Sequence, residues 1–174
     1  MARPSEQDVA AFLLLKKSLV RVMEWTDRPS LKTPQWKAFE SRCYVGSSIS
    51  EEANFRAHYR PKGLKVRGEA TIELPEAFYV SIWIREYRVF AIDTMQGQVH
   101  TNRIVDGMPY SGMEITATTH MHIWTSAADG YAEPIEPPLV ELEEIITAFC
   151  QRVNLRLNGI VRHPMYGQSM SLLE

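Results

Sequence analysis

The feature that most constrains this fold is a long stretch, residues 35–125, in which apolar and polar side chains alternate. Successive side chains of a β-strand point to opposite sides, so this period is typical of strands with one buried face. The segment AFYVSIWIREYRVFAIDT is rich in β-branched and aromatic residues and predicts two adjacent strands joined near residues 85–87. One face of the first strand is apolar and should lie in the core: Phe78, Val80, Ile82 and Ile84.

Helical patterns flank this region on both sides. Over residues 5–25 apolar side chains recur near a 3.6-residue period, and Ser5 with Asp8 resembles a capping box. Residues 138–153 form a second amphipathic pattern with glutamates near its beginning, where the helix dipole favours negative charge. The sequence therefore predicts one α+β domain over residues 1–174: an antiparallel sheet of about five to seven strands, packed by an N-terminal and a C-terminal helix.

Composition restricts the class of protein. With 174 residues, 45% hydrophobic and 23% charged, the chain can bury a core without disulfides or metal as a staple. A net charge of −2 argues against a protein that holds long nucleic acid through many phosphate contacts, but a local basic patch is compatible with it. The longest N-terminal apolar run, VAAFLLL, is far short of the roughly twenty residues that cross a bilayer, so no membrane partner is expected. We expect Cys43 and Cys150 to be free thiols and the protein to be cytoplasmic.

The stretch THMHIW contains the most distinctive pair of side chains. His120 and His122 are two residues apart in a predicted strand, so both point the same way with about 7 Å between their backbones. Two imidazoles at this spacing can converge on one ion, with His100 or Asp93 as a third ligand. Zinc or another first-row divalent ion would suit such nitrogen and oxygen ligands. A cofactor is therefore either absent or a divalent metal ion.

The same residues also permit chemistry without a metal. One histidine could act as general base and another as general acid, which suits cleavage of a phosphodiester in a nucleotide or RNA. In this hypothesis the catalytic residues are His100, His120, His122 and Asp93. The residues that would hold the substrate are Asn102, Arg103 and Tyr110. Further phosphate contacts could come from Arg56, Arg60, Lys62, Lys65 and Arg67, although this segment also reads as a solvated hairpin.

A third interpretation, beside metal binding and acid–base catalysis, is that the histidines have a structural role. Polar sheet faces commonly carry threonine and histidine, and Trp124 on the same side of the strand suggests that a helix or loop partly covers this face, with the histidines under Trp124. They would then be hydrogen-bonded packing residues. The sequence leaves open whether the protein is an enzyme.

Several short elements together resemble an uncharacterised family of small bacterial and phage proteins, a domain of unknown function. These elements are AID with HTN, THMHIW with GYAEPI, and a closing helix that ends in FCQRVNL, and the similarity covers about residues 50–160. The resemblance implies a bacterial or phage origin and action inside the cell. It implies no reaction, cofactor or partner.

Two classes of function follow from these observations. The first is a histidine-rich site that binds or cleaves a phosphodiester or nucleotide, as in a toxin or phage-conflict system. The second is a non-enzymatic interaction protein, such as an inhibitor, antitoxin or assembly module, that contacts a protein partner or forms a homodimer. An exposed apolar strip at Leu13–Leu15 would favour the second class.

Overall fold

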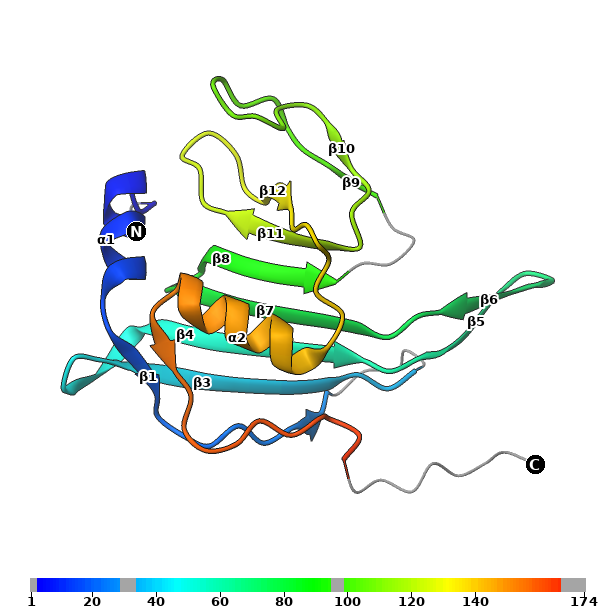
Figure 1. Ribbon diagram of the computed structural model, residues 1–174, viewed down its shortest axis with the longest axis horizontal. Helices are drawn as coiled ribbons and strands as arrows, with labels where there is room; N and C mark the ends of the chain where they lie inside the picture. Colours follow the sequence, from blue (N-terminus) through cyan, green and yellow to red (C-terminus); the bar gives the residue numbers. More distant parts are fainter. Residues whose placement is uncertain (1–2, 29–33, 95–98, 167–174) are drawn as a thin grey trace.

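The chain folds into a broad β-sheet with one helix lying across its face (Figure 1). In this computed structural model, which describes residues 3–28, 34–94 and 99–166, nine strands belong to the main sheet. The elements in chain order are α1 (Glu6–Leu14), β1 (Lys17–Leu19), β2 (Thr26–Asp27), β3 (Lys37–Val45), β4 (Ser48–Arg60), β5 (Gly63–Arg67), β6 (Ala70–Leu74), β7 (Ala77–Ile84), β8 (Tyr87–Thr94), β9 (His100–Thr101), β10 (Glu114–Ile115), β11 (Thr119–Ile123), β12 (Tyr131–Pro134), α2 (Leu142–Arg152) and β13 (Leu155–Arg156).

The strand order in the main sheet is β12-β11-β8-β7-β4-β3-β1-β13, with β2 pairing with β3 outside this row. Every pair is antiparallel except β1 with β13, so the sheet is mixed at one edge. Two short hairpins extend from it: β5–β6, which projects from one end, and β9–β10, which lies beyond β11 and β12 (Figure 1). The α+β class and the predominantly antiparallel sheet are as predicted.

The strand count is larger than the predicted five to seven, and strands occur outside residues 35–125. The additional strands β1, β2, β12 and β13 contain two to four residues each. Strands this short complete at most two alternations, so a period of two cannot be recognised in them. The predicted pair joined near residues 85–87 is present as β7 and β8, and Arg85 in the turn has a positive φ of 56°.

The predicted N-terminal helix over residues 5–25 is too long, because α1 ends at Leu14. Its start is as expected, since Ser5 and Asp8 form a capping box. At its end, the Lys17 ammonium donates hydrogen bonds to the carbonyls of Phe12, Leu13 and Leu15 at 2.6, 3.2 and 2.6 Å. These carbonyls would otherwise lack partners at a helix C-terminus. The chain then continues as strand β1.

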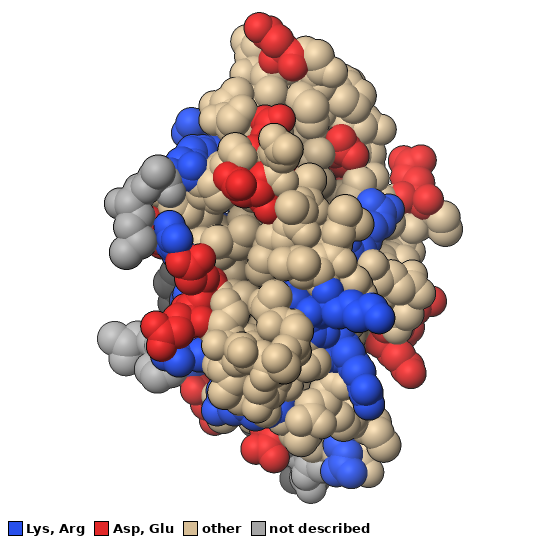
Figure 2. All heavy atoms as spheres, turned by 90° about the vertical axis from the view of Figure 1, so that its left-hand side faces the viewer, with Lys and Arg blue, Asp and Glu red and all other residues tan. Residues whose placement is uncertain are grey.

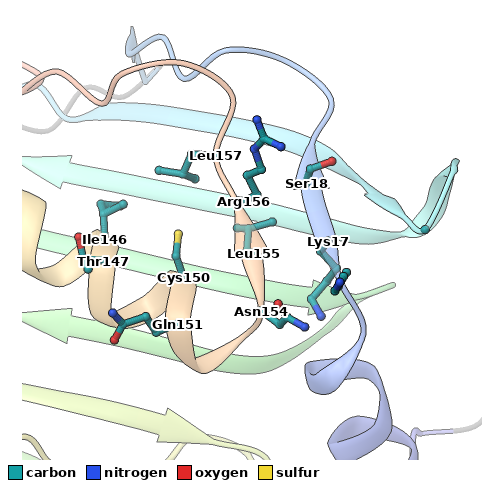
Figure 3. A pocket seen from close by; sticks show the side chains of 12 residues that line it. Lys17, Ser18, Ile146, Thr147, Cys150, Gln151, Asn154, Leu155, Arg156 and Leu157 are labelled. Atoms are coloured by element: carbon teal, nitrogen blue, oxygen red, sulfur yellow. The ribbon is translucent and has the colours of Figure 1, made fainter.

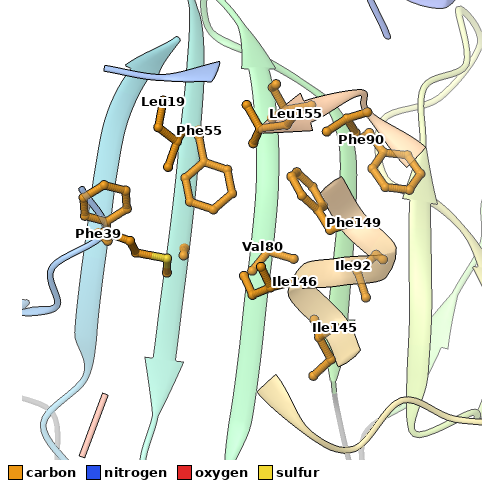
Figure 4. Close-up of a cluster of buried hydrophobic side chains, with 14 of the residues drawn as sticks. Leu19, Phe39, Phe55, Val80, Phe90, Ile92, Ile145, Ile146, Phe149 and Leu155 are labelled. Atoms are coloured by element: carbon orange, nitrogen blue, oxygen red, sulfur yellow. The ribbon is translucent and has the colours of Figure 1, made fainter. Parts of the chain in front are cut away.

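The core lies between α2 and the near face of the sheet (Figure 4). The C-terminal helix begins at Leu142 rather than residue 138, and it buries Leu142, Ile145, Ile146 and Phe149. Phe149 packs against Phe55 and Phe90 with ring centroids 5.7 and 5.8 Å apart. Of the predicted core face of β7, Phe78, Val80 and Ile82 are buried and Ile84 is partly buried against the cluster.

A smaller apolar cluster of Val105, Ala128 and Tyr131 holds the segment after β9 against β11 and β12. Among the described residues no helix has the length and apolar character that crossing a membrane requires. Cys43 is buried, Cys150 is partly buried, and both are free thiols as expected.

Candidate functional site

The central strands bring three of the predicted site residues together. In the pairing of β11 with β8, His120 lies opposite Asp93 and His122 lies opposite Ala91. Met121 and Ile123 of the same strand pack against the main core, so the alternation turns both histidines to the sheet face away from α2. Asp93, the last but one residue of β8, points to the same side.

Three ligand atoms converge at this point. The Nε2 atoms of His120 and His122 lie 3.1 Å apart, and Nε2 of His122 lies 3.1 Å from Oδ2 of Asp93. One ligand atom from each of the three residues lies within 4.8 Å of the other two. All three side chains are buried, with exposed fractions of 1%, 6% and 6% for His120, His122 and Asp93. Burial at this level removes the water that would otherwise solvate these groups.

The hydrogen bonds of His122 determine which of its nitrogens faces the cluster with a lone pair. Its Nδ1 lies 3.1 Å from the carbonyl oxygen of Gly130. A carbonyl oxygen can only accept, so Nδ1 carries the proton and donates. In the neutral ring Nε2 then presents a lone pair towards the Asp93 carboxylate and towards His120. Nε2 of His122 and Oδ2 of Asp93 are therefore two acceptors 3.1 Å apart, an arrangement that is favourable only with a cation or a proton between them.

Burial also controls the charge of the cluster. It lowers the pKa of His120 to about 4, and the neighbouring His122 acts in the same direction. His120 is therefore neutral at pH 7. The Asp93 carboxylate also lies 3.5 Å from the Arg88 guanidinium, which is one-third exposed. Arg88 is a residue that the sequence analysis missed, because nothing in its local pattern marks it as close to Asp93.

His100 lies beside the three convergent residues without joining them. Its ring centroid is 5.0 Å from that of His122 and 5.8 Å from that of His120. Burial, followed by the influence of His122, lowers the pKa of His100. Its side chain is half-buried, so it lies between the cluster and the surface. The structure thus brings His100, His120, His122 and Asp93 into one site.

The predicted substrate-binding residues occupy other places. Asn102 is 4% exposed, and its amide binds both the N–H and the carbonyl of Ala132 as well as the carbonyl of Tyr110. This amide fastens β9 to the edge strand β12. Tyr110 packs against the small apolar cluster, and Arg103 is exposed in the loop that follows β9. The Asn102 side chain also hydrogen-bonds His100 and so holds that ring in place. Among the described residues, Arg103 and Tyr110 make no hydrogen bond or ion pair with the histidines.

The face of the histidines is covered, with His120 and His122 1% and 6% exposed, but Trp124 is not on it. Strand β11 ends at Ile123, and Trp124 packs against the main core on the opposite side. Its ring contacts Tyr87, and its Nε1 donates to the carbonyl of Pro4 at 3.2 Å. The histidines are enclosed instead by His100 and by the segment around Gly130.

The predicted basic residues divide into two groups. Arg56 and Arg60 lie on β4, on the same sheet face as the histidines. Lys62 is exposed just before β5, and Lys65 and Arg67 lie on the exposed hairpin β5–β6, away from the site. Only the first group can act with the histidine cluster.

A pocket of about 560 Å³ lies elsewhere, between α2 and the edge formed by β1 and β13 (Figure 3). Its lining contains no histidine or carboxylate. Burial raises the pKa of the Cys150 thiol to about 12, so this sulfur is not a thiolate at neutral pH. The Lys17 ammonium is held by the carbonyls of α1. Burial lowers the pKa of Lys17 to about 8, but its ammonium is already bound by these carbonyls, so the histidine cluster is the stronger candidate.

Comparison with known proteins adds no relative: no family model, no curated protein and no solved structure matches this chain. Inference about function therefore rests on the residues of the site.

Proposed function

We propose that Asp93, His120 and His122 bind a divalent first-row transition-metal ion, most plainly Zn²⁺, and that this centre acts on a phosphodiester. The observation that supports this most directly is the convergence of three ligand atoms, of which two pairs are 3.1 Å apart and all lie within 4.8 Å of one another. Two ligands at 2.0–2.1 Å from a tetrahedral ion lie about 3.3 Å apart. The side chains therefore stand close to the spacing that such an ion requires.

The surroundings of His122 support the same proposal. Histidines that bind metal ions usually donate their other ring N–H to a carbonyl or carboxylate, which fixes the tautomer. His122 makes this contact with Gly130. His120 needs no deprotonation to bind a metal at pH 7, since its pKa is about 4.

The chemistry follows from the number of ligands. Two histidines and one carboxylate leave a tetrahedral ion one further position for water or substrate, as in catalytic zinc sites. A zinc ion in such a site lowers the pKa of bound water to about 7 and polarises a phosphoryl oxygen. His100 lies beside the cluster and is the residue suited to move a proton there.

Metal binding can be tested without knowledge of the substrate. Elemental analysis and zinc titration should show one ion per wild-type chain and at least ten-fold weaker binding in Asp93→Asn and His122→Ala. His163→Gln is a matched control, because His163 also faces a carboxylate, with Nε2 2.8 Å from Glu76, but has no second histidine there. Equal zinc binding by wild-type and Asp93→Asn protein would contradict the proposal. A proton shared between His122 and Asp93 would then account for the cluster.

The reaction needs a separate assay. With zinc or manganese present, wild-type protein should cleave a fluorescent single-stranded oligonucleotide, and Asp93→Asn should lose that activity with its fold intact. Metal-loaded wild-type protein that binds the oligonucleotide but leaves it uncut under these conditions would restrict the proposal to a binding site.

A second candidate, a non-enzymatic interaction protein, has its own observation. Of the predicted strip, Leu14 and Leu15 at the end of α1 are 78% and 48% exposed, whereas Leu13 packs partly against the main core. The side of the molecule on which α1 lies has broad uncharged areas between its acidic and basic groups (Figure 2). If this surface forms a homodimer, Leu14→Asp should reduce the molecular mass measured by light scattering to that of a monomer. In both candidates we place the protein in the bacterial cytoplasm, encoded by the bacterium or by a phage. A toxin or phage-conflict system would act there.

A further inference from the structure

The sheet face around the histidine cluster carries a second set of groups that the metal centre does not use. We call it the platform face: the side of β4, β7 and β8 that points away from α2. Its members outside the cluster are Asn54, Arg56, His58, Arg60, Tyr79, Ser81, Trp83 and Arg88. The neighbouring Trp36, just before β3, stacks on Tyr79 with ring centroids 5.5 Å apart and an interplanar angle of 9°.

The platform face is basic although the chain carries a net charge of −2. Three guanidinium groups, from Arg56, Arg60 and Arg88, share it with the carboxylates of Glu40 and Asp93. The Asp93 carboxylate is already shared with His122. Glu40 lies 3.8 Å from Arg56 and is largely exposed, so solvent weakens that ion pair. The local balance of charge therefore favours an anionic ligand.

Arg60 is the most informative of these residues. It is 6% exposed, and its Nη2 donates to the carbonyl of Pro75 at 3.0 Å. Its Nε is buried without a hydrogen-bond partner among the described residues, and so is Nε of Arg56. No described carboxylate lies within ion-pair distance of Arg60. A buried guanidinium in this state has unused donors whose burial costs free energy, and a phosphate group would satisfy them.

Aromatic rings lie beside these guanidinium groups at two points. One is the Trp36–Tyr79 stack, and the other is Trp83, which lies under the Arg56 guanidinium at 4.3 Å from the ring centroid. All three rings are half-buried and so keep part of their surface exposed. Tyr79 and Trp83 are four residues apart on β7, which places them about 13 Å apart. One nucleobase cannot contact both points, whereas two bases of one strand can.

The cross-strand register places these points beside the histidine cluster. Tyr79 lies opposite Asp93, which lies opposite His120, and Ser81 lies opposite Ala91, which lies opposite His122. Ser81 and Ala91, between Trp83 and the cluster, have small side chains and are 9% and 0% exposed, because larger neighbouring side chains cover them. A strand that contacts both aromatic points therefore passes next to Asp93 and His122.

We infer that the platform face binds a single-stranded nucleic acid, with two bases stacked on Trp36–Tyr79 and on Trp83 and with phosphates held by Arg60 and Arg56. Aromatic stacking combined with cationic contacts is the general means by which proteins hold single strands without reading their sequence. The inference names a substrate for the proposed metal centre and rests on that proposal for its function. Binding itself needs no metal ion.

Binding can be measured by fluorescence anisotropy with a short labelled single-stranded RNA, and separately DNA, on protein treated with a chelator. Wild-type protein should bind at low salt. Trp83→Ala should weaken binding roughly ten-fold, and Arg56→Met should lower the slope of log K against log salt concentration by about 0.7. Arg67→Met on the exposed hairpin β5–β6 is the matched control and should bind within two-fold of wild type. RNA and DNA arms identify which strand is preferred.

Several outcomes would overturn the inference. These are no binding by wild-type protein at low salt, equal losses in Trp83→Ala and Arg67→Met, or competition by a mononucleotide as strong as that by the oligonucleotide. Arg60→Met tests the buried guanidinium, but Arg56→Met and Trp83→Ala keep the test valid if that variant does not fold. Asp93→Asn separates the two proposals. If this variant binds the nucleic acid without cutting it, both proposals are supported. If the wild-type protein binds zinc but no nucleic acid, only the metal site remains.

Discussion

At the residue scale, His120 shows how burial changes the chemistry of a histidine. Its ring is 1% exposed and lies 3.1 Å from the ring of His122, so a proton on it would be both desolvated and close to another ring that takes up protons. The pKa of about 4 therefore follows from its position on β11. Two residues further along the strand, His122 keeps a carbonyl partner and a carboxylate neighbour.

This difference predicts a pH dependence of the metal-free protein. The folded pKa of His120 is about 4 against an ordinary value of 6.5, so below pH 6.5 the unfolded chain binds a proton that the folded chain does not. The contribution to the free energy of unfolding is fully present above pH 6.5 and is lost as the pH falls towards 4, in total on the order of 3 kcal/mol. Urea denaturation at several pH values, with chelator present, measures it.

The comparison variant is His120→Gln, which cannot titrate and should lose less stability on acidification than wild type. His163→Gln replaces a histidine outside the cluster and is the control for the substitution itself. Identical pH profiles for wild type and His120→Gln would show that the pKa of His120 is the same in the folded and the unfolded chain. A chemical-shift titration of the His120 ring gives the same information without a substitution.

The pairing of His120 with His122 could be predicted from sequence, because alternation in a strand places i and i+2 on one side. Asp93 and His100 could be named as candidates from their residue types. Arg88, the Gly130 carbonyl, Tyr79 and Trp83 could not, because their positions depend on which strands become neighbours and in what register. Cross-strand register is set by the whole sheet and is not written in any local segment.

At the scale of elements, the end of α1 illustrates the same limit. Apolar residues up to Met23 continue a helical period, yet the chain leaves the helix at Leu14 because β1 pairs with β3 and β13. Tertiary pairing outweighs the weak intrinsic preference of the segment. The Lys17 side chain then donates hydrogen bonds to the carbonyls at the end of α1, while its backbone pairs with β3 in the sheet.

The hydrogen bonds by which the Asn102 amide fastens β9 to β12 give the second prediction. Asn102→Leu removes three hydrogen bonds and leaves the N–H and carbonyl of Ala132 unpaired on one side. The cost to the free energy of unfolding should be about 2 kcal/mol or more. Because His100 is two residues before Asn102, the variant should also alter the environment of the His100 ring, visible in its NMR signals.

Arg103→Ala is the natural control for this element, since Arg103 is exposed in the same loop. It should change the free energy of unfolding by less than about 0.5 kcal/mol. Equal destabilisation by the two variants would mean that the loop as a whole, rather than the Asn102 amide, holds β9 in place.

At the scale of the whole molecule, the proposed metal site joins β8 to β11 in the sheet and so links metal binding to global stability. A ligand that binds only the folded chain stabilises it by about 2.7 kcal/mol at a concentration one hundred times Kd. For a domain of this size that corresponds to a rise in Tm of roughly 5–10 °C. Zn²⁺ should therefore raise the Tm of wild-type protein by this amount, and Mg²⁺, which prefers oxygen ligands, should not.

The site predicts which variants lose this effect. Asp93→Asn and His122→Ala should melt at the same temperature with and without zinc, while His163→Gln should keep the full rise. A rise in Tm that persists in Asp93→Asn would place zinc elsewhere on the surface. A lower Tm with zinc in every variant would indicate binding to the unfolded chain, and the three convergent atoms of β8 and β11 would then be held together by a proton.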